Sequence, residues 1–308
     1  MSFALAKPLQ VLSTIGMIAD SVEVIGADCV ESQSLMGPGV DPHLYQASAS
    51  DVRSLRDAEV IFYSGYHLEG QLAEVLARFA KNQTVISVAE EAIDTGLTLQ
   101  ISEHVTDPHV WMDVSLWQKT IPVILETLSS AYPRSAYPQC QEAMQARATA
   151  YEASLSALDS WVRESIASIA TEQRLLVTAH DAFAYYGRAY DLEVSSVQGI
   201  STQAEASISD IRNVVDQVIA RKVPAIFVES SVNPATIEAV LAAVEAEGQN
   251  LKLGETLFSD AMGEKGTVNG NYIGMIYHNT RAITEALGGR LAPLPEALQA
   301  WAEAWDIE

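Results

Sequence analysis

The chain has 308 residues, which exceeds one ordinary hydrophobic core and suits two domains. Apolar residues make up 48% of it, so each half can bury a core of its own. Its 40 acidic residues outnumber 18 basic ones and give a formal charge of −22, which argues against nucleic acid and anionic lipid as partners.

The N-terminal stretch MSFALAK resembles the end of a secretory signal peptide. The Ala-Leu-Ala sequence at 4–6 has the small-x-small pattern of a cleavage site, although no long apolar stretch precedes it. We interpret it as the remnant of such a site, which predicts an exported, periplasmic protein. An ordinary cytosolic start is the alternative.

Short apolar runs then alternate with helical patterns. Strands are predicted at 9–14, 29–36, 59–65 and 84–88, and helices at 16–26, 47–58 and 68–80. This alternation is typical of βαβ units and a parallel sheet. It predicts an N-terminal lobe over residues 1–133.

A long helix is predicted to follow. Residues 139–174 contain neither Gly nor Pro, and apolar residues recur at helical spacing: Tyr151, Leu155, Leu158, Val162, Ile166 and Ile169. The helix, assigned to 134–173, would be roughly 45–50 Å long. Because a helix bends little, we expect the parts it joins to move only slightly against each other.

The second half of the chain shows the same alternation of predicted strands and helices. Strands are predicted at 174–179, 192–197, 225–230 and 251–258, and helices at 181–190, 207–222, 233–248 and 272–289. The predicted fold class is therefore α/β, with two βα lobes that have mostly parallel four-stranded sheets. The C-terminal lobe comprises 174–308.

The tripeptide Asp-Pro-His occurs twice, in GPGVDPHLY (37–45) and in TDPHVW (106–111). Proline fixes its own φ and restricts the residue before it, so His43 and His109 lie on stiffened turns. A histidine held in this way loses less entropy when it binds a ligand.

Four side chains follow predicted strands and become candidate metal ligands. They are His43, His109, His180 and Asp260, two from each lobe. Ligands of doubly wound sheets bind outside the carboxyl ends of the strands, so all four can converge on the cleft between the lobes. Three imidazoles and one carboxylate suit a first-row divalent metal such as zinc or manganese.

Seven segments of the chain, in order, resemble one family over residues 9–287: the zinc- and manganese-binding solute-binding proteins of bacterial ABC importers, the TroA-like group. The segments are LMGPGVDPHLY, VIFYSGYHLEG, DPHVWMDV, VTAHDAFAYYGRAY, QGISTQAEAS, AIFVESS and LFSDAMGEKGTVNGNYIGMIYHN.

The resemblance implies two lobes joined by a single long helix, with one transported metal ion at their interface. The family's ligand positions fall on His43, His109, His180 and Asp260. The implied partner is a membrane permease, and a monomer is expected. His180 favours zinc over manganese, with iron third, whereas the loop at 89–106 lacks the many histidines found in zinc specialists.

Two other functions are weighed against the carrier: a metal-dependent hydrolase and a surface adhesin. A catalytic zinc keeps a position open for water, which four protein ligands would close. The chain has no HExxH, GxSxG, P-loop or GxGxxG motif, and no repeat or low-complexity stalk. The prediction is therefore a carrier and not an enzyme.

Other polar and aromatic residues near the motifs have more ordinary interpretations. Glu205 and Glu229 are candidates to accept hydrogen bonds from ligating imidazoles, with salt bridges as the alternative. Trp111 and Tyr45 are expected to shield the site from solvent. Three histidines are interpreted as loop or packed residues: His67, His104 and His278.

Two cysteines, Cys29 and Cys140, lie outside any CxxC pair. In an exported protein they can form one disulfide, and in a cytosolic protein they would be two separate thiols. Cys29 opens a predicted strand and Cys140 opens the long helix. Both can therefore lie at the end of the N-terminal lobe that is remote from the metal ligands, and we expect a disulfide.

Overall fold

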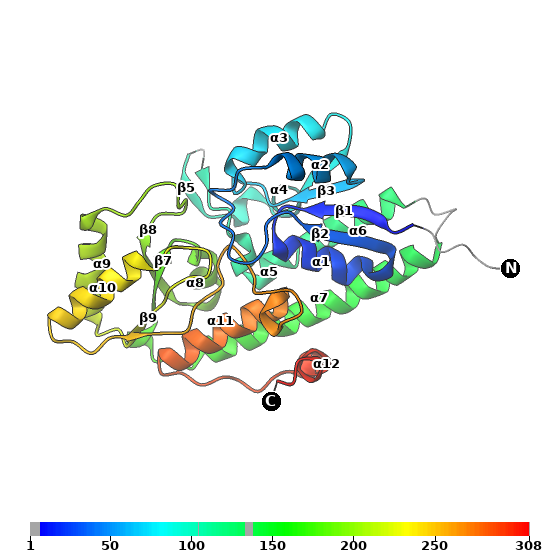
Figure 1. The fold of residues 1–308 in the computed structure, drawn as a ribbon. Helices are drawn as coiled ribbons and strands as arrows, with labels where there is room; N and C mark the ends of the chain where they lie inside the picture. Colours follow the sequence, from blue (N-terminus) through cyan, green and yellow to red (C-terminus); the bar gives the residue numbers. More distant parts are fainter. Residues whose placement is uncertain (1–6, 104, 133–137, 308) are drawn as a thin grey trace.

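A computed structural model describes residues 7–103, 105–132 and 138–307. It shows two lobes side by side, with helix α7 running beneath both of them (Figure 1). The Ala-Leu-Ala stretch at 4–6, His104 and the predicted boundary between residues 133 and 134 lie outside the described residues.

The N-terminal lobe is built on the predicted parallel sheet. Its strand order is β2-β1-β3-β4, and all three pairings are parallel. The strands are β1 (Leu9–Ser13), β2 (Val30–Ser34), β3 (Val60–Tyr63) and β4 (Thr84–Ser87). The connecting helices are α1 (Gly16–Gly26), α2 (Ala49–Asp57) and α3 (Ala73–Phe79).

The predicted helix at 68–80 begins later than expected. Tyr66 and His67 have positive φ, and the Glu69 carboxylate accepts hydrogen bonds from the backbone N–H groups of Ser64 and Gly65. These contacts hold the chain in a turn after β3, followed by a single 3-10 turn before α3.

Between β4 and the long helix, the chain forms short elements that line the inner side of this lobe. They are α4 (Val88–Ala92), the antiparallel hairpin β5 (Gln100–Ser102) and β6 (Val105–Thr106), α5 (Val114–Trp117) and α6 (Thr120–Ala131).

The C-terminal lobe contains two parallel pairs, β7 with β8 and β9 with β10. The pairs are joined by a hydrogen bond from the N–H of Phe227 to the carbonyl of Val177, so the strands lie in the order β8-β7-β9-β10. The elements are β7 (Leu175–His180), α8 (Ala184–Tyr190), β8 (Glu193–Gln198), α9 (Ile208–Arg221), β9 (Ala225–Ile226), α10 (Ala235–Ala246) and β10 (Lys252–Leu253).

Strands β9 and β10 are much shorter than the predicted runs at 225–230 and 251–258. Their pairing resumes at an isolated bridge between Glu229 and Leu257, with one extra residue on the β10 side. An inserted residue interrupts the ladder in the way a β-bulge does. The two segments stay side by side, but regular strand geometry is lost between them.

The two lobes share one topology. In each lobe the first strand, helix, second strand, loop and second helix follow in the same order, and the sheet orders β2-β1-β3-β4 and β8-β7-β9-β10 match. Both second helices also begin with a capping box, Ser48 with Asp51 in α2 and Ser207 with Asp210 in α9. The loop at 37–48 therefore corresponds to the loop at 199–207.

The long helix α7 spans Pro138–Ala167 and ends before the predicted position near residue 174. Arg174 explains the early end, because its guanidinium donates hydrogen bonds to the carbonyls of Ala167 (2.8 Å) and Ile169 (2.9 Å). A basic side chain that satisfies the last carbonyls stabilises a helix C-terminus. At 1.5 Å per residue the helix is roughly 45 Å long.

The N-terminal end of α7 is fastened to the N-terminal lobe. Cys29 and Cys140 form a disulfide, as expected. Arg147 donates hydrogen bonds to the carbonyls of Ile25 (2.7 Å) and Gly26 (2.8 Å) at the end of α1. This end of the molecule lies opposite the carboxyl ends of the strands (Figure 1).

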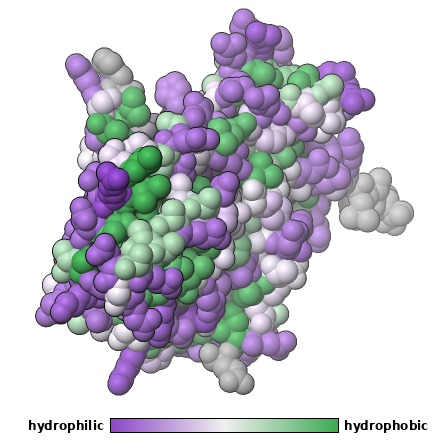
Figure 2. Space-filling model, turned by 60° about the vertical axis from the view of Figure 1, so that its left-hand side comes forward, coloured by the Kyte–Doolittle hydropathy of each residue, from purple (hydrophilic) through white to green (hydrophobic). Residues whose placement is uncertain are grey.

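Two further helices complete the C-terminal part, α11 (Tyr272–Ala286) and α12 (Glu296–Ala304), and both pack on α7. With the C-terminal lobe forward, hydrophilic and apolar residues are interspersed over the surface (Figure 2). Within the described ranges, no helix combines the length and apolar character needed to cross a membrane.

Candidate metal centre

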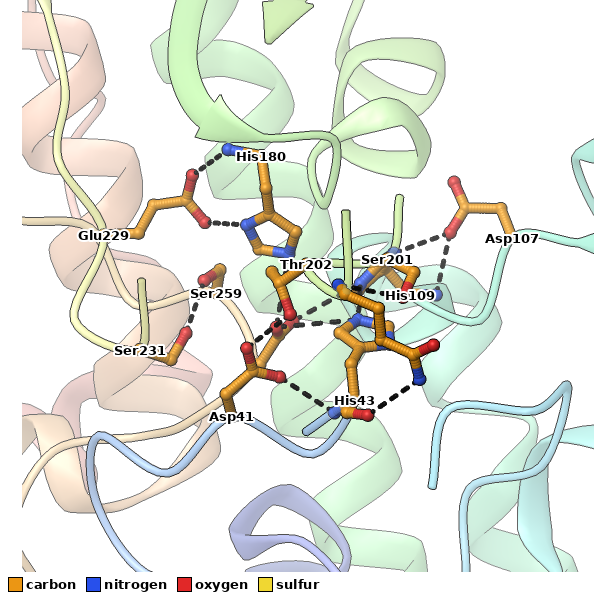
Figure 3. Close-up of polar contacts among 12 residues, drawn as sticks. Asp41, His43, Asp107, His109, His180, Ser201, Thr202, Glu229, Ser231 and Ser259 are labelled. Carbon is orange, nitrogen blue, oxygen red and sulfur yellow. Dashed lines mark hydrogen bonds and ion pairs between the residues drawn. The ribbon is translucent and has the colours of Figure 1, made fainter. Parts of the chain in front are cut away.

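The two Asp-Pro-His tripeptides form the same local turn. In each, the aspartate carboxylate accepts a hydrogen bond from the backbone N–H of the histidine two residues on: Asp41 from His43 (2.8 Å) and Asp107 from His109 (2.9 Å). Such turns are a known preference of aspartate, and the intervening proline restricts the backbone further. The turn fixes the direction in which each imidazole projects (Figure 3).

The C-terminal lobe supplies the other two candidates. His180 is the last residue of β7, and its N–H donates a hydrogen bond to Glu229 (2.8 Å). Asp260 lies in the loop after β10, where the preceding Phe258 is held by two hydrogen bonds to the side chain of Asn279 in α11 (2.9 and 2.7 Å).

The structure brings these four side chains together between the lobes. One donor atom from each of them lies within 4.8 Å of the donor atoms of the other three. The Nε2 atoms of His43, His109 and His180 lie 3.8, 3.4 and 3.2 Å from Asp260 carboxylate oxygens. The Nε2 atoms of His43 and His109 are 3.2 Å apart.

All four side chains are buried, with exposed fractions of 4% for His43, 0% for His109 and His180, and 1% for Asp260. Neither carboxylate oxygen of Asp260 makes a hydrogen bond of good geometry among the described residues, and the same holds for Nε2 of His180, although the nearest imidazole nitrogens lie 3.2 and 3.4 Å from the carboxylate. Burying such atoms without partners is costly. A cation that accepts all four donors would remove that cost.

Two buried carboxylates lie behind the histidines. Asp107 is 2.8 Å from Nδ1 of His109, and Glu229 is 2.5 Å from Nδ1 of His180. In both histidines, His109 and His180, the other ring nitrogen Nε2 then points toward Asp260. Carboxylates in this position orient an imidazole and raise its basicity.

Of the two glutamates singled out in the sequence, Glu229 therefore contacts a candidate ligand, whereas Glu205 is exposed on the loop at 199–207. The sequence pattern attributed the stiffness of the turn to the proline and predicted no separate role for Asp107. Its place two residues before the histidine is the signal that could have revealed the second contact.

The electrostatics of the site differ between the histidines. Burial lowers the pKa of His43 to about 4. For His109 burial acts in the same direction, but Asp107 and Asp260 outweigh it and raise the pKa to about 9. Burial likewise opposes the charged form of His180, yet Glu229 and Asp260 raise its pKa well above the usual value. The pKa of Asp260 is held well below its usual value by His180 and His109, although burial alone would raise it.

The other candidates among the described residues are not part of the group of four donors. His67 is exposed in the turn after β3, and His278 in α11 shares a hydrogen bond with the carbonyl of Thr256 (2.9 Å). Trp111 is fully buried with its ring 5.3 Å from that of His109, as expected for a residue that shields the site. Tyr45 instead donates a hydrogen bond to Asp51 in α2 (2.8 Å).

The shared topology of the lobes extends to the site. Thr14 follows β1 at the place that His180 occupies in β7, and its hydroxyl donates to the buried Glu69 (2.7 Å). Glu69 follows the third strand of its lobe, as Glu229 does. Both lobes thus hold a buried glutamate against the end of the first strand, and only the C-terminal lobe has a histidine there.

Comparisons with known proteins agree with this architecture. The family model described as "ZnuA: Zinc-uptake complex component A periplasmic" matches residues 11–286. The zinc-binding protein TroA of Treponema pallidum is 44% identical over 281 residues, which cover 91% of this chain and 89% of TroA. The manganese-binding lipoprotein MntA of Bacillus subtilis is 43% identical over 282 residues, covering 91% and 90%.

Solved structures give the same result. The periplasmic zinc-binding protein TroA from T. pallidum superposes with a TM-score of 0.87 at 43% identity, covering 92% of this chain and 100% of TroA. Fe(III)-bound YtgA from Chlamydia trachomatis gives a TM-score of 0.81 at 28% identity, covering 92% and 99%. The chain therefore belongs to the ZnuA family of periplasmic zinc-uptake components, and its two-lobed fold is that of TroA.

Proposed function

We propose that this chain is an extracytoplasmic solute-binding protein that captures one divalent transition-metal ion between its lobes and delivers it to the permease of an ABC importer. The ligands are Nε2 of His43, His109 and His180 together with the carboxylate of Asp260. The ion is cargo, so the protein must bind it tightly and also release it.

The observation that carries the proposal is the spacing of the four donor atoms. A tetrahedral zinc ion with ligands at about 2.0–2.1 Å separates its donors by roughly 3.3 Å. The Nε2 atoms of His43 and His109 are 3.2 Å apart, and the three Nε2 atoms lie 3.2, 3.4 and 3.8 Å from one or other oxygen of Asp260. One donor atom from each residue lies within 4.8 Å of the other three. The cluster therefore has the size of a coordination shell, with its oxygens and nitrogens turned inward.

Zinc is the metal that the donor set favours. Affinity for a site rich in nitrogen generally rises from manganese to zinc. Related proteins are named for zinc, for manganese and for Fe(III), so the fold accommodates all three. We rank zinc first, manganese second and iron third.

The same geometry opposes a hydrolase. Three imidazoles and a carboxylate complete a four-coordinate shell, and a catalytic zinc would need one of these positions for water. The related proteins offer no support for an adhesin. The protein is therefore a carrier and not an enzyme.

The family description places the family in a periplasmic uptake complex, which supports export and a membrane permease as partner. The acidic surface implied by a net charge of −22 would attract cations to the protein. We propose that the monomer docks on the permease and that the disulfide forms in the oxidising periplasm.

Metal analysis of protein purified without added metal, followed by competition between zinc and manganese, tests the function. We expect about one metal ion per chain, sub-micromolar affinity and tighter binding of zinc. The His43→Ala/His180→Ala double variant should lose this binding while remaining folded. Wild-type affinity in the double variant, or metal-dependent hydrolysis of simple esters or peptides, would contradict the proposal.

A further inference from the structure

We propose that Asp41, Thr202 and Gln203 form a latch between the lobes that positions His43 and limits the rate at which bound metal leaves. The proposal rests on the metal-binding function above and adds an order of events: His43 detaches first. Asp41 lies in the loop at 37–48, and Thr202 and Gln203 lie in the corresponding loop of the other lobe.

His43 is held differently from the other two histidines. His109 and His180 each have a buried carboxylate against Nδ1, whereas the ion pair that His43 makes within the described residues runs through Nε2 to Asp260, at 3.8 Å. His43 is also the most exposed of the four ligands and the histidine farthest from Asp260. The ring of His43 therefore lacks the carboxylate behind it that orients the other two rings, and other contacts must set its position.

That support comes from the backbone on both sides of His43. Its N–H donates to Oδ1 of Asp41 (2.8 Å), and Oδ2 of the same carboxylate accepts a hydrogen bond from the hydroxyl of Thr202 (2.5 Å). Its carbonyl accepts a hydrogen bond from Nε2 of Gln203 (3.1 Å). Both peptide groups of His43 are thus connected to the C-terminal lobe (Figure 3).

The two Asp-Pro-His turns differ in this respect. In the His109 turn, Oδ1 of Asp107 bonds both the backbone N–H and Nδ1 of the same histidine, so these carboxylate contacts stay within one lobe. In the His43 turn, the second oxygen of Asp41 points across the cleft instead. The same aspartate turn thus orients His109 through contacts within one lobe, whereas the orientation of His43 depends on a contact between the lobes.

The His109 side of the interface is closed by buried contacts. Trp111 donates from Nε1 to the carbonyl of Ser259 (2.9 Å), and its own carbonyl accepts from the hydroxyl of Tyr272 (2.7 Å). The hydroxyl of Tyr185 donates to the carbonyl of Asp107 (2.9 Å). These buried contacts hold His109 close to His180 and Asp260, so these three ligands stay in place when His43 moves.

The latch, in contrast, is accessible to water. Gln203 is exposed, and Asp41 and Thr202 are half-buried. Hydrogen bonds of this kind break more easily than fully buried ones because water can replace the lost partner. Separation at the loops at 37–48 and 199–207 would withdraw His43 and leave the metal on three ligands, from which it escapes faster.

The test measures metal release directly. The full chain, loaded with one equivalent of Zn²⁺, is mixed with excess chromophoric chelator, and the dissociation rate is recorded by stopped flow. Thr202→Val should raise that rate about tenfold, which corresponds to ~1.4 kcal/mol, because a charged hydrogen bond is lost. Gln203→Ala should raise it about threefold, since the lost partner is a neutral carbonyl.

Two further variants separate positioning from general damage. Thr202→Ser keeps the hydroxyl and should release metal at the wild-type rate. Thr127→Val removes a hydroxyl that bonds only within α6 (2.8 Å to the carbonyl of Val123) and serves as the matched control. The association rate should stay unchanged in all of them. The melting temperature of the metal-free protein should stay unchanged in Thr202→Ser, which keeps the hydroxyl.

The results distinguish a failure of the proposed metal binding from a failure of the latch. A wild-type protein that retains no zinc would overturn the proposed function and the latch together. If the wild type binds zinc but Thr202→Val releases it within twofold of the wild-type rate, the latch alone is wrong. The same conclusion follows if Thr202→Ser is as fast as Thr202→Val.

Discussion

At the scale of single residues, carboxylates set the properties of the histidines. Glu229 and Asp107 lie against the Nδ1 atoms of His180 and His109, and Asp260 lies against their Nε2 atoms. Glu229 and Asp107 orient the rings, and Asp260 is the proposed fourth metal ligand beside them. Burial favours the neutral form, but the two flanking carboxylates outweigh it and raise the pKa of both imidazoles. We therefore expect each ring to be protonated when no metal is present and to lose that proton when a metal binds.

Glu229→Gln should weaken zinc binding by roughly 10- to 100-fold, the usual effect of removing the carboxylate behind a ligating histidine. The amide keeps the shape of the side chain but supplies no negative charge to His180. Glu205→Gln is the matched control, because this glutamate is exposed and should leave affinity unchanged. Chelator competition measures both, and equal affinities for the two variants would contradict the assignment.

Zinc binding at pH 7 should release about two protons per ion, because metal ligands must be deprotonated. The raised pKa values of His109, about 9, and of His180 keep both rings protonated in the metal-free protein, whereas the pKa of His43, about 4, keeps it neutral. Apparent affinity should therefore rise with pH between about 7 and 9.

Calorimetric titrations at pH 7 in buffers of different protonation enthalpy measure the proton release. The slope of the observed enthalpy against the buffer enthalpy gives the number of protons, and a slope of zero would show that the two rings are already neutral.

At the scale of elements, α7 decides how the lobes are held. Its first turns are tied to the N-terminal lobe by the disulfide and Arg147, and its later part packs against α8, α11 and α12 of the C-terminal part. The helix α7 is thus packed against both lobes and is not a free linker between them. Relative motion must then occur as small shifts between packed surfaces.

Removing the disulfide with Cys29→Ser/Cys140→Ser should lower the free energy of unfolding by roughly 2–5 kcal/mol. The bond closes a loop over a sequence separation of 111 residues, so its loss frees much of the unfolded chain. Urea unfolding measures the effect. Zinc affinity should change less than about threefold, because the bond lies at the far end of the lobe, and a larger loss would show that α7 transmits strain to the site.

At the scale of the whole molecule, the proposed metal ion would bridge the two lobes. Two of the four candidate ligands come from each lobe, so an ion bound by all four would bind the native arrangement and not the separated or unfolded lobes. A ligand at about 100 times its dissociation constant stabilises the folded state by ~2.7 kcal/mol.

Differential scanning calorimetry should therefore show a single transition that rises by roughly 5 °C when zinc is added at this excess. His180→Ala should show no rise at the same concentration of free zinc. Two separate transitions in the loaded protein would mean that the lobes unfold independently and that the ion does not join them.

Much of the fold could be predicted from the sequence, because it depends on local patterns. The alternation of apolar runs with helical spacing predicted seven of the strands and helices of the N-terminal lobe. The boundaries that were wrong depended on particular side-chain hydrogen bonds and on strand pairing, which apolar periodicity does not show. Arg174 ends α7 at Ala167, and an inserted residue interrupts the pairing of β9 with β10.

By itself, the sequence determined which residues could serve as ligands. The Asp-Pro-His turns, the placement of His180 and Asp260 after strands, and the two cysteines are all local features of the chain. Only the tertiary structure decided how these parts cooperate: which carboxylate lies behind which imidazole, and that Asp41 reaches across to Thr202 while Asp107 stays with His109. The physical reason is distance along the chain. A turn is specified by neighbouring residues, whereas a hydrogen bond between residues separated by 161 positions exists only once two lobes have packed against a common helix.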